Sequence, residues 1–139
     1  MRVYIAGKLG TENEKDVLEK IDLLCKSLGF ETFLPHRDIG ICKDIKDVKR
    51  VFNGDIEKGF DNVDVVVAVL DGLHVGAGTS WELGYAYARG IPAIGLKSDE
   101  PIKEALEYLS AILIGSMKFV SSFEELKEKL QQFKEISDN

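Results

Sequence analysis

The segment Val63–Pro92, VDVVVAVLDGLHVGAGTSWELGYAYARGIP, decides the fold of this chain. It opens with an unbroken apolar run, Val65–Leu70, of the β-branched kind expected of a strand that is buried on both faces. The loop Asp71–Gly78 follows, and its glycines at positions 72, 76 and 78 allow the backbone to approach a ligand closely. Thr79–Arg89 is predicted to form a helix that stops at Gly90, before Pro92. A strand, a glycine-rich loop and a helix N-terminus, in that order, form a common ligand site in α/β proteins.

The same alternation of strand and helix patterns extends to both sides of this segment. Strands are predicted at Arg2–Ala6, Glu31–Leu34, Val63–Leu70 and Ile91–Leu96, with a fifth inside Ala111–Val120. Four further helices are predicted. The first begins at a capping box formed by Thr11 and Glu14, and the last is capped by Ser122. The two between them span Asp44 to about Lys58 and Pro101–Leu109.

Five strands that alternate with five helices predict an α/β fold of flavodoxin-like (Rossmann-like) type, a three-layer sandwich around a five-stranded parallel sheet. The simplest strand order with right-handed crossovers is 2-1-3-4-5. In that order the loops after the first and third strands meet, so Tyr4–Leu9 and Asp71–Glu82 are expected to share one crevice.

Composition narrows the classes of function. The 139 residues are 45% hydrophobic and 30% charged, which predicts one soluble globular domain over residues 1–139. The net charge of −6 argues against a nucleic acid polymer or an anionic membrane as partner. Since no signal-peptide pattern and no long apolar run occur, a cytoplasmic protein is expected. Neither the two cysteines nor His36 and His74 have metal-ligand spacing, so no metal or cofactor is predicted.

Glu82 has two interpretations. Thr79-x-x-Glu82 is a capping-box pattern, in which the glutamate side chain would bind the Thr79 amide. Alternatively, Glu82 is a nucleophile or base that the positive end of the helix dipole keeps ionised. A cap needs only Thr79. A nucleophile needs a hydrogen-bond donor that orients it, which Tyr4 can supply in the predicted fold, and also a nearby acid. Asp55 and Asp71 are the candidate acids, although Asp71 also suits a plain turn at the end of a strand.

Two further loop features have weak signals. Gly76-x-Gly78 lacks the third glycine of a dinucleotide fingerprint and follows the third strand instead of the first. Arg37 lies in a loop near the crevice, where it would either meet a phosphate or be solvated.

The motif DVVVAVLDG at 64–72, followed by GTSWELGYAYARGIP at 78–92, resembles the nucleoside 2-deoxyribosyltransferase family and the related nucleoside 5′-monophosphate N-hydrolases. The resemblance extends from VYIAG at 3–7 to LSAIL at 109–113. It implies an enzyme that needs no cofactor and acts on a small nucleoside or nucleotide and a free base. By resemblance, Glu82 is the nucleophile that attacks the anomeric carbon, Tyr4 orients it and Asp55 handles the leaving base. Substrate contacts are expected from Gly7, Asp71, Gly76, Gly78, Thr79 and, on a neighbouring subunit of a homo-oligomer, Ser110.

Two positions depart from the pattern of the family. Many transferases have an aspartate six residues before the nucleophile and the hydrolases tend to have a serine there, whereas this chain has Gly76. Transferases commonly carry Asn-Leu-Met near the C-terminus, whereas this chain has Ser110-Ala111-Ile112, which is closer to the hydrolases and favours a nucleotide substrate.

The resemblance predicts cleavage of the N-glycosidic bond of 2′-deoxynucleosides and transfer of the deoxyribosyl group to another base through a covalent glycosyl-glutamate. The alternative is a 2′-deoxynucleoside 5′-monophosphate N-hydrolase that releases free base. A third hypothesis is a nucleotide-binding module that kept the fold without the chemistry, and Gly76 is the reason to consider it.

Overall fold

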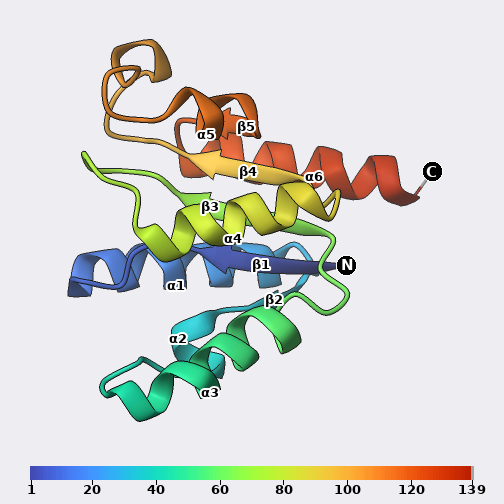
Figure 1. The fold of residues 1–139 in the computed structure, drawn as a ribbon. Helices are drawn as coiled ribbons and strands as arrows, with labels where there is room; N and C mark the ends of the chain where they lie inside the picture. Colours follow the sequence, from blue (N-terminus) through green and yellow to red (C-terminus); the bar gives the residue numbers. More distant parts are fainter. Residues whose placement is uncertain (139) are drawn as a thin grey trace.

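One parallel sheet forms the centre of the molecule (Figure 1). The structure is a computed structural model that describes residues 1–138. The strands are ordered β2-β1-β3-β4-β5, which confirms the predicted flavodoxin-like arrangement. Their bounds are Arg2–Ala6 for β1, Glu31–Phe33 for β2, Val65–Val69 for β3, Ala93–Leu96 for β4 and Lys118–Val120 for β5.

Helices cover both faces of the sheet and make three layers (Figure 1). Helices α1 (Glu12–Ser27) and α6 (Phe123–Asp138) pack on the face that carries Val3, Ile5 and Val67. Helices α3 (Val48–Phe52) and α4 (Ala77–Ala88) lie on the opposite face, to which alternate residues such as Tyr4 and Val66 point. Strands β1 and β3 are buried on both faces, which explains their continuous apolar sequences.

The register of the central strands creates the expected crevice. Val3 pairs with Val65 and Ala6 with Ala68, so β1 and β3 end at the same edge of the sheet. The chain leaves β1 toward α1 on one face and leaves β3 toward α4 on the other. The loops after β1 and β3 therefore flank one opening, as the strand order predicted.

The segment between β2 and β3 differs from the single long helix that was predicted for Asp44–Lys58. It contains a short α2 (Pro35–Asp38), a 3₁₀ turn η1 (Ile45–Asp47), α3 and a π-helix η2 (Asn53–Lys58). Two glycines allow the wide π-turn to pack closely. A Cβ at Gly54 would lie 2.6 Å from Ile39, and a Cβ at Gly59 would overlap the Asp55 carbonyl oxygen.

The C-terminal predictions were partly wrong. Pro101–Leu109, predicted as a helix, contains only the 3₁₀ turn η3 (Ile102–Glu104). The Tyr108 hydroxyl donates a hydrogen bond of 2.7 Å to the Glu100 carboxylate and so links the two ends of this segment. The fifth strand predicted inside Ala111–Val120 is confirmed as β5, at the end of that range, and the residues before it form α5 (Ala111–Gly115), where the Ser110 hydroxyl caps the Ile112 amide. A short apolar run such as Ala111–Ile114 suits either a buried strand or a helix, so periodicity alone did not locate the strand within the range.

Several local predictions were confirmed. Thr11 and Glu14 form the capping box of α1, and Ser122 accepts the Glu125 amide in the first turn of α6. Gly90 follows α4 with a positive φ of 72°, which is the conformation that ends a helix.

Within residues 1–138, no helix is long and apolar enough to cross a membrane, and no group of three or more His, Cys, Asp or Glu residues is placed to hold a metal ion.

Candidate active site

Glu82 lies deeper in its helix than the sequence suggested. Helix α4 begins at Ala77 with Gly76 as its N-cap, so Glu82 is in the second turn. Thr79 is a buried residue within the helix and caps nothing, so the Thr79-x-x-Glu82 capping box was wrong. The Glu82 carboxylate instead accepts a hydrogen bond from the Tyr4 hydroxyl, across the crevice from strand β1. The Glu82 side chain therefore faces the crevice, as the interpretation of Glu82 as a nucleophile or base requires.

Tyr4 is a rigid donor. Its ring is completely buried and lies between Phe33 and Phe60, with ring centroids 5.3 and 4.1 Å away. Burial, together with the negative charge of Glu82 and the hydrogen bond to it, raises the pKa of the Tyr4 phenol well above its usual range. The phenol therefore keeps its proton at every physiological pH and holds Oε2 of Glu82 in one position.

Burial also controls the charge of Glu82. It raises the pKa of this carboxyl from 4.5 to about 7, although the Tyr4 hydrogen bond lowers it, and the nearby Asp55 raises it further. We expected the helix dipole to keep Glu82 ionised, but the side chain lies beyond the first turn, where that effect fades. At neutral pH the carboxyl group is consequently divided between its ionised and protonated forms.

Asp55 provides the second carboxyl group of the site. It belongs to the π-helix η2, a type of helix that is frequent at functional sites. Its Oδ1 is buried, and among the described residues it has no hydrogen-bond partner. Burial raises the pKa of Asp55 to about 6, and the positive charge of Arg50 offsets this only in part. A carboxyl group whose pKa is raised toward neutrality is still partly protonated there, which suits it to act as a general acid.

Two hollows meet at these carboxyl groups. The first is a cavity of about 220 Å³ that follows the loops after β1 and β3, and we call it the loop cavity. The second is an apolar groove of about 490 Å³ between α3 and α4. Asp55, Gly78 and Glu82 line both hollows, so an atom bound at the junction would be in reach of both carboxyl groups. The other residues of the groove are Cys42, Val48, Val51, Phe52, Ile56, Ala77 and Trp81.

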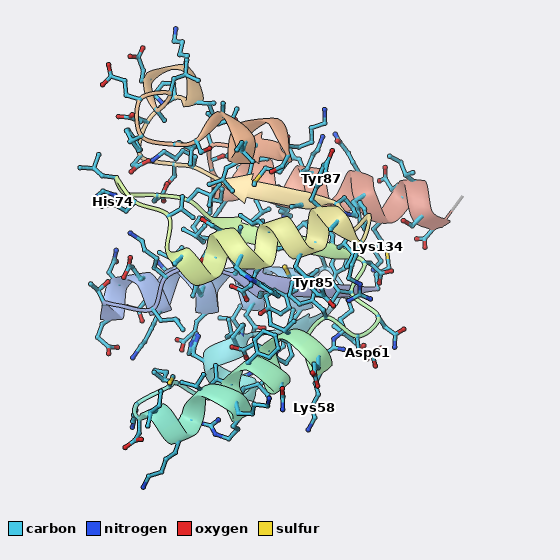
Figure 2. The ribbon with its side chains drawn as sticks, in the orientation of Figure 1. Lys58, Asp61, His74, Tyr85, Tyr87 and Lys134 are labelled. Carbon is cyan, nitrogen blue, oxygen red and sulfur yellow. The ribbon has the colours of Figure 1, made fainter. Side chains whose placement is uncertain are left out.

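Aromatic rings connect the groove to Tyr4. Trp81 meets the edge of Phe52 at 5.8 Å and stacks on Tyr85 at 5.4 Å, and Tyr85 meets the edge of Phe60 at 5.1 Å. Figure 2 shows Tyr85 on the side of α4 toward α3, whereas Tyr87 lies on the side toward β4. The row of rings stiffens the wall of the groove and supports the Phe60 ring on which Tyr4 rests.

The structure places two predicted site residues elsewhere. Asp71 lies outside the loop cavity and accepts hydrogen bonds from the Ser98 amide at 2.5 Å and hydroxyl at 2.6 Å. It fastens the β3–α4 loop to the loop after β4, as a residue of a structural turn. Ser110, the N-cap of α5, lines a separate hollow with Ser80 and Tyr87. A contact between Ser110 and a substrate at Glu82 would therefore have to come from a second copy of the chain.

The other predicted residues lie at the loop cavity: Gly7, Gly76, Gly78 and Thr79 all line it. Arg37 is not free to meet a ligand there, because it pairs with Asp22 at 2.9 Å and with Asp38 at 2.8 Å. His74 is exposed on the β3–α4 loop (Figure 2) and lines neither the loop cavity nor the groove.

Sequence reasoning assigned no role to two residues of the loop cavity, Lys8 and His36. Lys8 falls within the Tyr4–Leu9 segment that was expected in the crevice, so its position was available from the strand order. His36 was not, because only the fold brings the short helix α2 to the cavity.

Comparison with known proteins shows the family of the chain. Residues 3–133 match the family described as nucleoside 2-deoxyribosyltransferase, a range that includes Tyr4, Asp55 and Glu82. No protein with a curated description matches the chain.

Solved structures resemble the whole chain. A conserved protein from Enterococcus faecalis V583 has 28% sequence identity and a TM-score of 0.75, over 95% of this chain and 98% of the other. The 2-deoxyribosyltransferase from Bacillus psychrosaccharolyticus has 19% identity and a TM-score of 0.74, over 91% and 90%. The CMP N-glycosidase from Clostridium botulinum has 22% identity and a TM-score of 0.59, over 94% and 99%. At these identities the last two show a shared fold.

Proposed function

The chain belongs to the nucleoside 2-deoxyribosyltransferase family, and we propose that it cleaves the N-glycosidic bond of 2′-deoxynucleosides or their 5′-monophosphates and transfers the deoxyribosyl group to another base. Glu82 is the nucleophile in this proposal. The observation that carries it is the position of Glu82, which Tyr4 holds at the junction of the loop cavity and the groove, with Asp55 also at that junction.

The two hollows match the two parts of such a substrate. A planar base fits the apolar groove, where Trp81 and Phe52 offer aromatic surface. The sugar then occupies the loop cavity, with its anomeric carbon at the junction and near Glu82.

His36 suits a sugar hydroxyl. Its Nε2 lies 3.2 Å from the Glu19 carboxylate, which accepts hydrogen bonds, so Nε2 carries the proton of the neutral ring. Nδ1 is then an acceptor, and it is buried with no partner among the described residues. A hydroxyl of deoxyribose can donate to it.

In the first step the ionised Glu82 attacks the anomeric carbon, and the bond from that carbon to the base nitrogen breaks. The electron pair of this bond stays on the base, which takes a proton from Asp55. The ring develops positive charge in the transition state, and the carboxylate stabilises it before forming a glycosyl ester. Deoxyribose lacks the electron-withdrawing 2′-hydroxyl, so this charge forms at a lower cost.

In the second step a nitrogen of another base attacks the anomeric carbon, and the glutamate ester bond breaks. The Asp55 carboxylate takes the proton that the incoming base loses, and Glu82 leaves as the free carboxylate. Two displacements give net retention of configuration.

Hydrolysis is the second candidate, and the openness of the groove favours it. Trp81 and Phe52 are 51% and 45% exposed, so water can approach the junction beside the base or after the base has left. Water would then take the place of the second base, and the products would be free base and deoxyribose or its 5′-phosphate.

Chromatography of the reaction products tests the proposal. Several 2′-deoxynucleosides and their 5′-monophosphates are incubated with and without a second base. A new nucleoside or nucleotide that forms only with the second base supports transfer, and free base that forms in either case supports hydrolysis. Glu82→Ala should abolish both, and Glu128→Gln, at an exposed position of α6, should change neither. Mass spectrometry of the quenched enzyme should find a deoxyribosyl group on Glu82. Turnover that survives in Glu82→Ala would exclude Glu82 as the nucleophile.

A further inference from the structure

The π-helix η2 contributes to both halves of the site. Its first turn carries Asp55, and Gly59 and Phe60 follow directly after its last residue. The Phe60 ring is completely buried, and its centroid lies 4.1 Å from that of Tyr4, the residue whose hydroxyl binds Glu82. The proposed acid and the donor that orients the proposed nucleophile therefore both depend on this one short segment.

Gly59 is closely packed on two sides. Its amide donates to the Gly54 carbonyl over 2.8 Å, which is the wide hydrogen bond between residues five apart that defines a π-helix. A Cβ at Gly59 would overlap the carbonyl oxygen of Asp55 and would lie 2.6 Å from the ring of Phe33. The φ of Gly59 is −62°, an ordinary value for any residue, so the glycine is required by the lack of space and not by the backbone conformation.

Phe33 continues this contact to Tyr4. The two rings are stacked, with their centroids 5.3 Å apart and their planes at 22°. Direct contacts thus lead from the Asp55 carbonyl through Gly59 and the Phe33 ring to the Tyr4 ring. Because protein interiors are closely packed, an atom added within such a series displaces its neighbours. The absence of a side chain at position 59 therefore limits how far the turn that carries Asp55 lies from Tyr4.

The side chain of Asp55 depends on this backbone for its position. Its Oδ1 is buried and has no hydrogen-bond partner within the part of the chain that the structure describes. The positive charge of Arg50 acts on it and lowers its pKa, against the effect of burial. Its own negative charge raises the pKa of Glu82 and that of Tyr4, so these three groups interact across the junction.

We infer that Gly59 is a positioning residue for the reaction, because its lack of a side chain lets the π-turn hold the Asp55 carboxyl group at the distance from Glu82 that the reaction needs. This inference rests on the proposed function and deepens it. Glu82 attacks the anomeric carbon while Asp55 gives a proton to the base bonded to that carbon, so the two carboxyl groups must fit the two ends of a single bond. A misplacement of about 1 Å can cost about a hundredfold in rate.

The kinetics of Gly59→Ala test this inference. The added methyl group should push the Asp55 turn away from the Phe33 ring, so we expect kcat to fall by about ten- to a hundredfold. KM should change little, because Gly59 lines neither the loop cavity nor the groove. Gly95→Ala is the matched control: its Cβ would lie 2.9 Å from two neighbouring side chains, so it overpacks β4 away from both hollows and should keep the wild-type kcat. An unchanged kcat in Gly59→Ala, or an equal loss in Gly95→Ala, would overturn the inference.

Carboxyl titrations test the same inference without any turnover. The pKa of Glu82 is measured by carbon NMR in the wild type and in Asp55→Asn, and again with Gly59→Ala added to each. Asp55→Asn should lower the pKa of Glu82, because it removes a negative charge that raises this pKa. The drop should be smaller when Gly59→Ala is present, since the interaction between charges weakens with distance, and it should keep its full size with Gly95→Ala. Equal drops in all backgrounds would contradict the role of Gly59, which simple destabilisation of the fold does not mimic.

A second variant covers the case in which Gly59→Ala alone does not fold. Adding Phe33→Leu removes the ring on one side of the new methyl group and leaves its overlap with the Asp55 carbonyl. This double variant should have a lower kcat and a smaller drop in the pKa of Glu82 than Phe33→Leu alone. Identical behaviour of the two would reject the inference.

The two measurements separate this inference from the proposed function. If the wild type cleaves no substrate and the interaction between Asp55 and Glu82 still depends on Gly59, the proposed function fails and the positioning of the carboxyl groups by Gly59 stands. If the wild type cleaves its substrates and Gly59→Ala changes neither kcat nor this interaction, the proposed function stands and the role of Gly59 is rejected.

Discussion

Replacing Glu82 with glutamine should stabilise the protein at alkaline pH. At acidic pH, where Glu82 of the wild type is protonated, the two proteins should not differ through ionisation. Burial raises the pKa of Glu82 from 4.5 to about 7. The folded protein therefore binds this proton more tightly than the unfolded chain does. The resulting stability is fully present below about pH 4.5 and is lost as the pH rises through about 7.

The magnitude follows from the same values. A tenfold change in proton affinity corresponds to about 1.4 kcal/mol, so ionising Glu82 should lower the free energy of unfolding by roughly 3 kcal/mol between pH 4.5 and pH 8. This is a large part of the 5–15 kcal/mol that is typical of a domain. Glutamine cannot ionise, yet its side-chain oxygen can still accept the Tyr4 hydrogen bond.

Urea unfolding followed by circular dichroism at pH 5 and pH 8 measures this effect. The free energy of unfolding of Glu82→Gln, relative to wild type, should rise by about 2.5 kcal/mol from pH 5 to pH 8. Glu128→Gln, at a solvent-exposed site, should show a small difference that does not vary with pH. If the Glu82→Gln difference were also the same at both pH values, the argument that burial raises the pKa of Glu82 would be refuted.

Five further predictions follow from the structure. Asp55→Asn should lower kcat by about 10²–10⁴, the usual contribution of a general acid. In the wild type, kcat/KM should peak between pH 6 and pH 7, because the pKa of Asp55 is about 6 and that of Glu82 about 7. Tyr4→Phe removes a hydrogen bond that lowers the pKa of Glu82, so a smaller fraction of Glu82 should be ionised and kcat/KM on the acid side of the profile should fall. Gly59→Ala should cost about 1–3 kcal/mol in thermal or urea melts, since the added Cβ would lie 2.6 Å from Phe33 and overlap the Asp55 carbonyl. Light scattering at micromolar concentration should show a homo-oligomer if Ser110 serves a neighbouring site, and a monomer would exclude that role.

Local patterns in the sequence determined the layers of the protein. Apolar runs such as Val65–Leu70 predicted buried strands, helical periodicity predicted α1 and α6, and the alternation of both predicted the parallel sheet with its order 2-1-3-4-5. Such patterns are predictive because each face of a strand or helix is either buried or exposed to solvent along its whole length. The strand order in turn located the crevice between the loops after β1 and β3. Errors arose in short segments, such as Pro101–Leu109, where only a 3₁₀ turn forms in place of the predicted helix.

The roles of the carboxyl groups depended on tertiary structure. Thr79-x-x-Glu82 fits a capping box locally, but packing started α4 at Ala77 and left Glu82 to face Tyr4, a residue 78 positions away. The residue pattern offered Asp55 and Asp71 as candidate acids, and the resemblance favoured Asp55. The fold buries Asp55 at the junction, whereas Asp71 is hydrogen-bonded to Ser98. The pKa of a carboxyl group depends on how many protein atoms replace water around it and on which charges lie nearby. Those quantities come from chain segments far apart in sequence, so the sequence alone located the crevice and most of the residues that line it, and only the folded structure decided what each of them can do there.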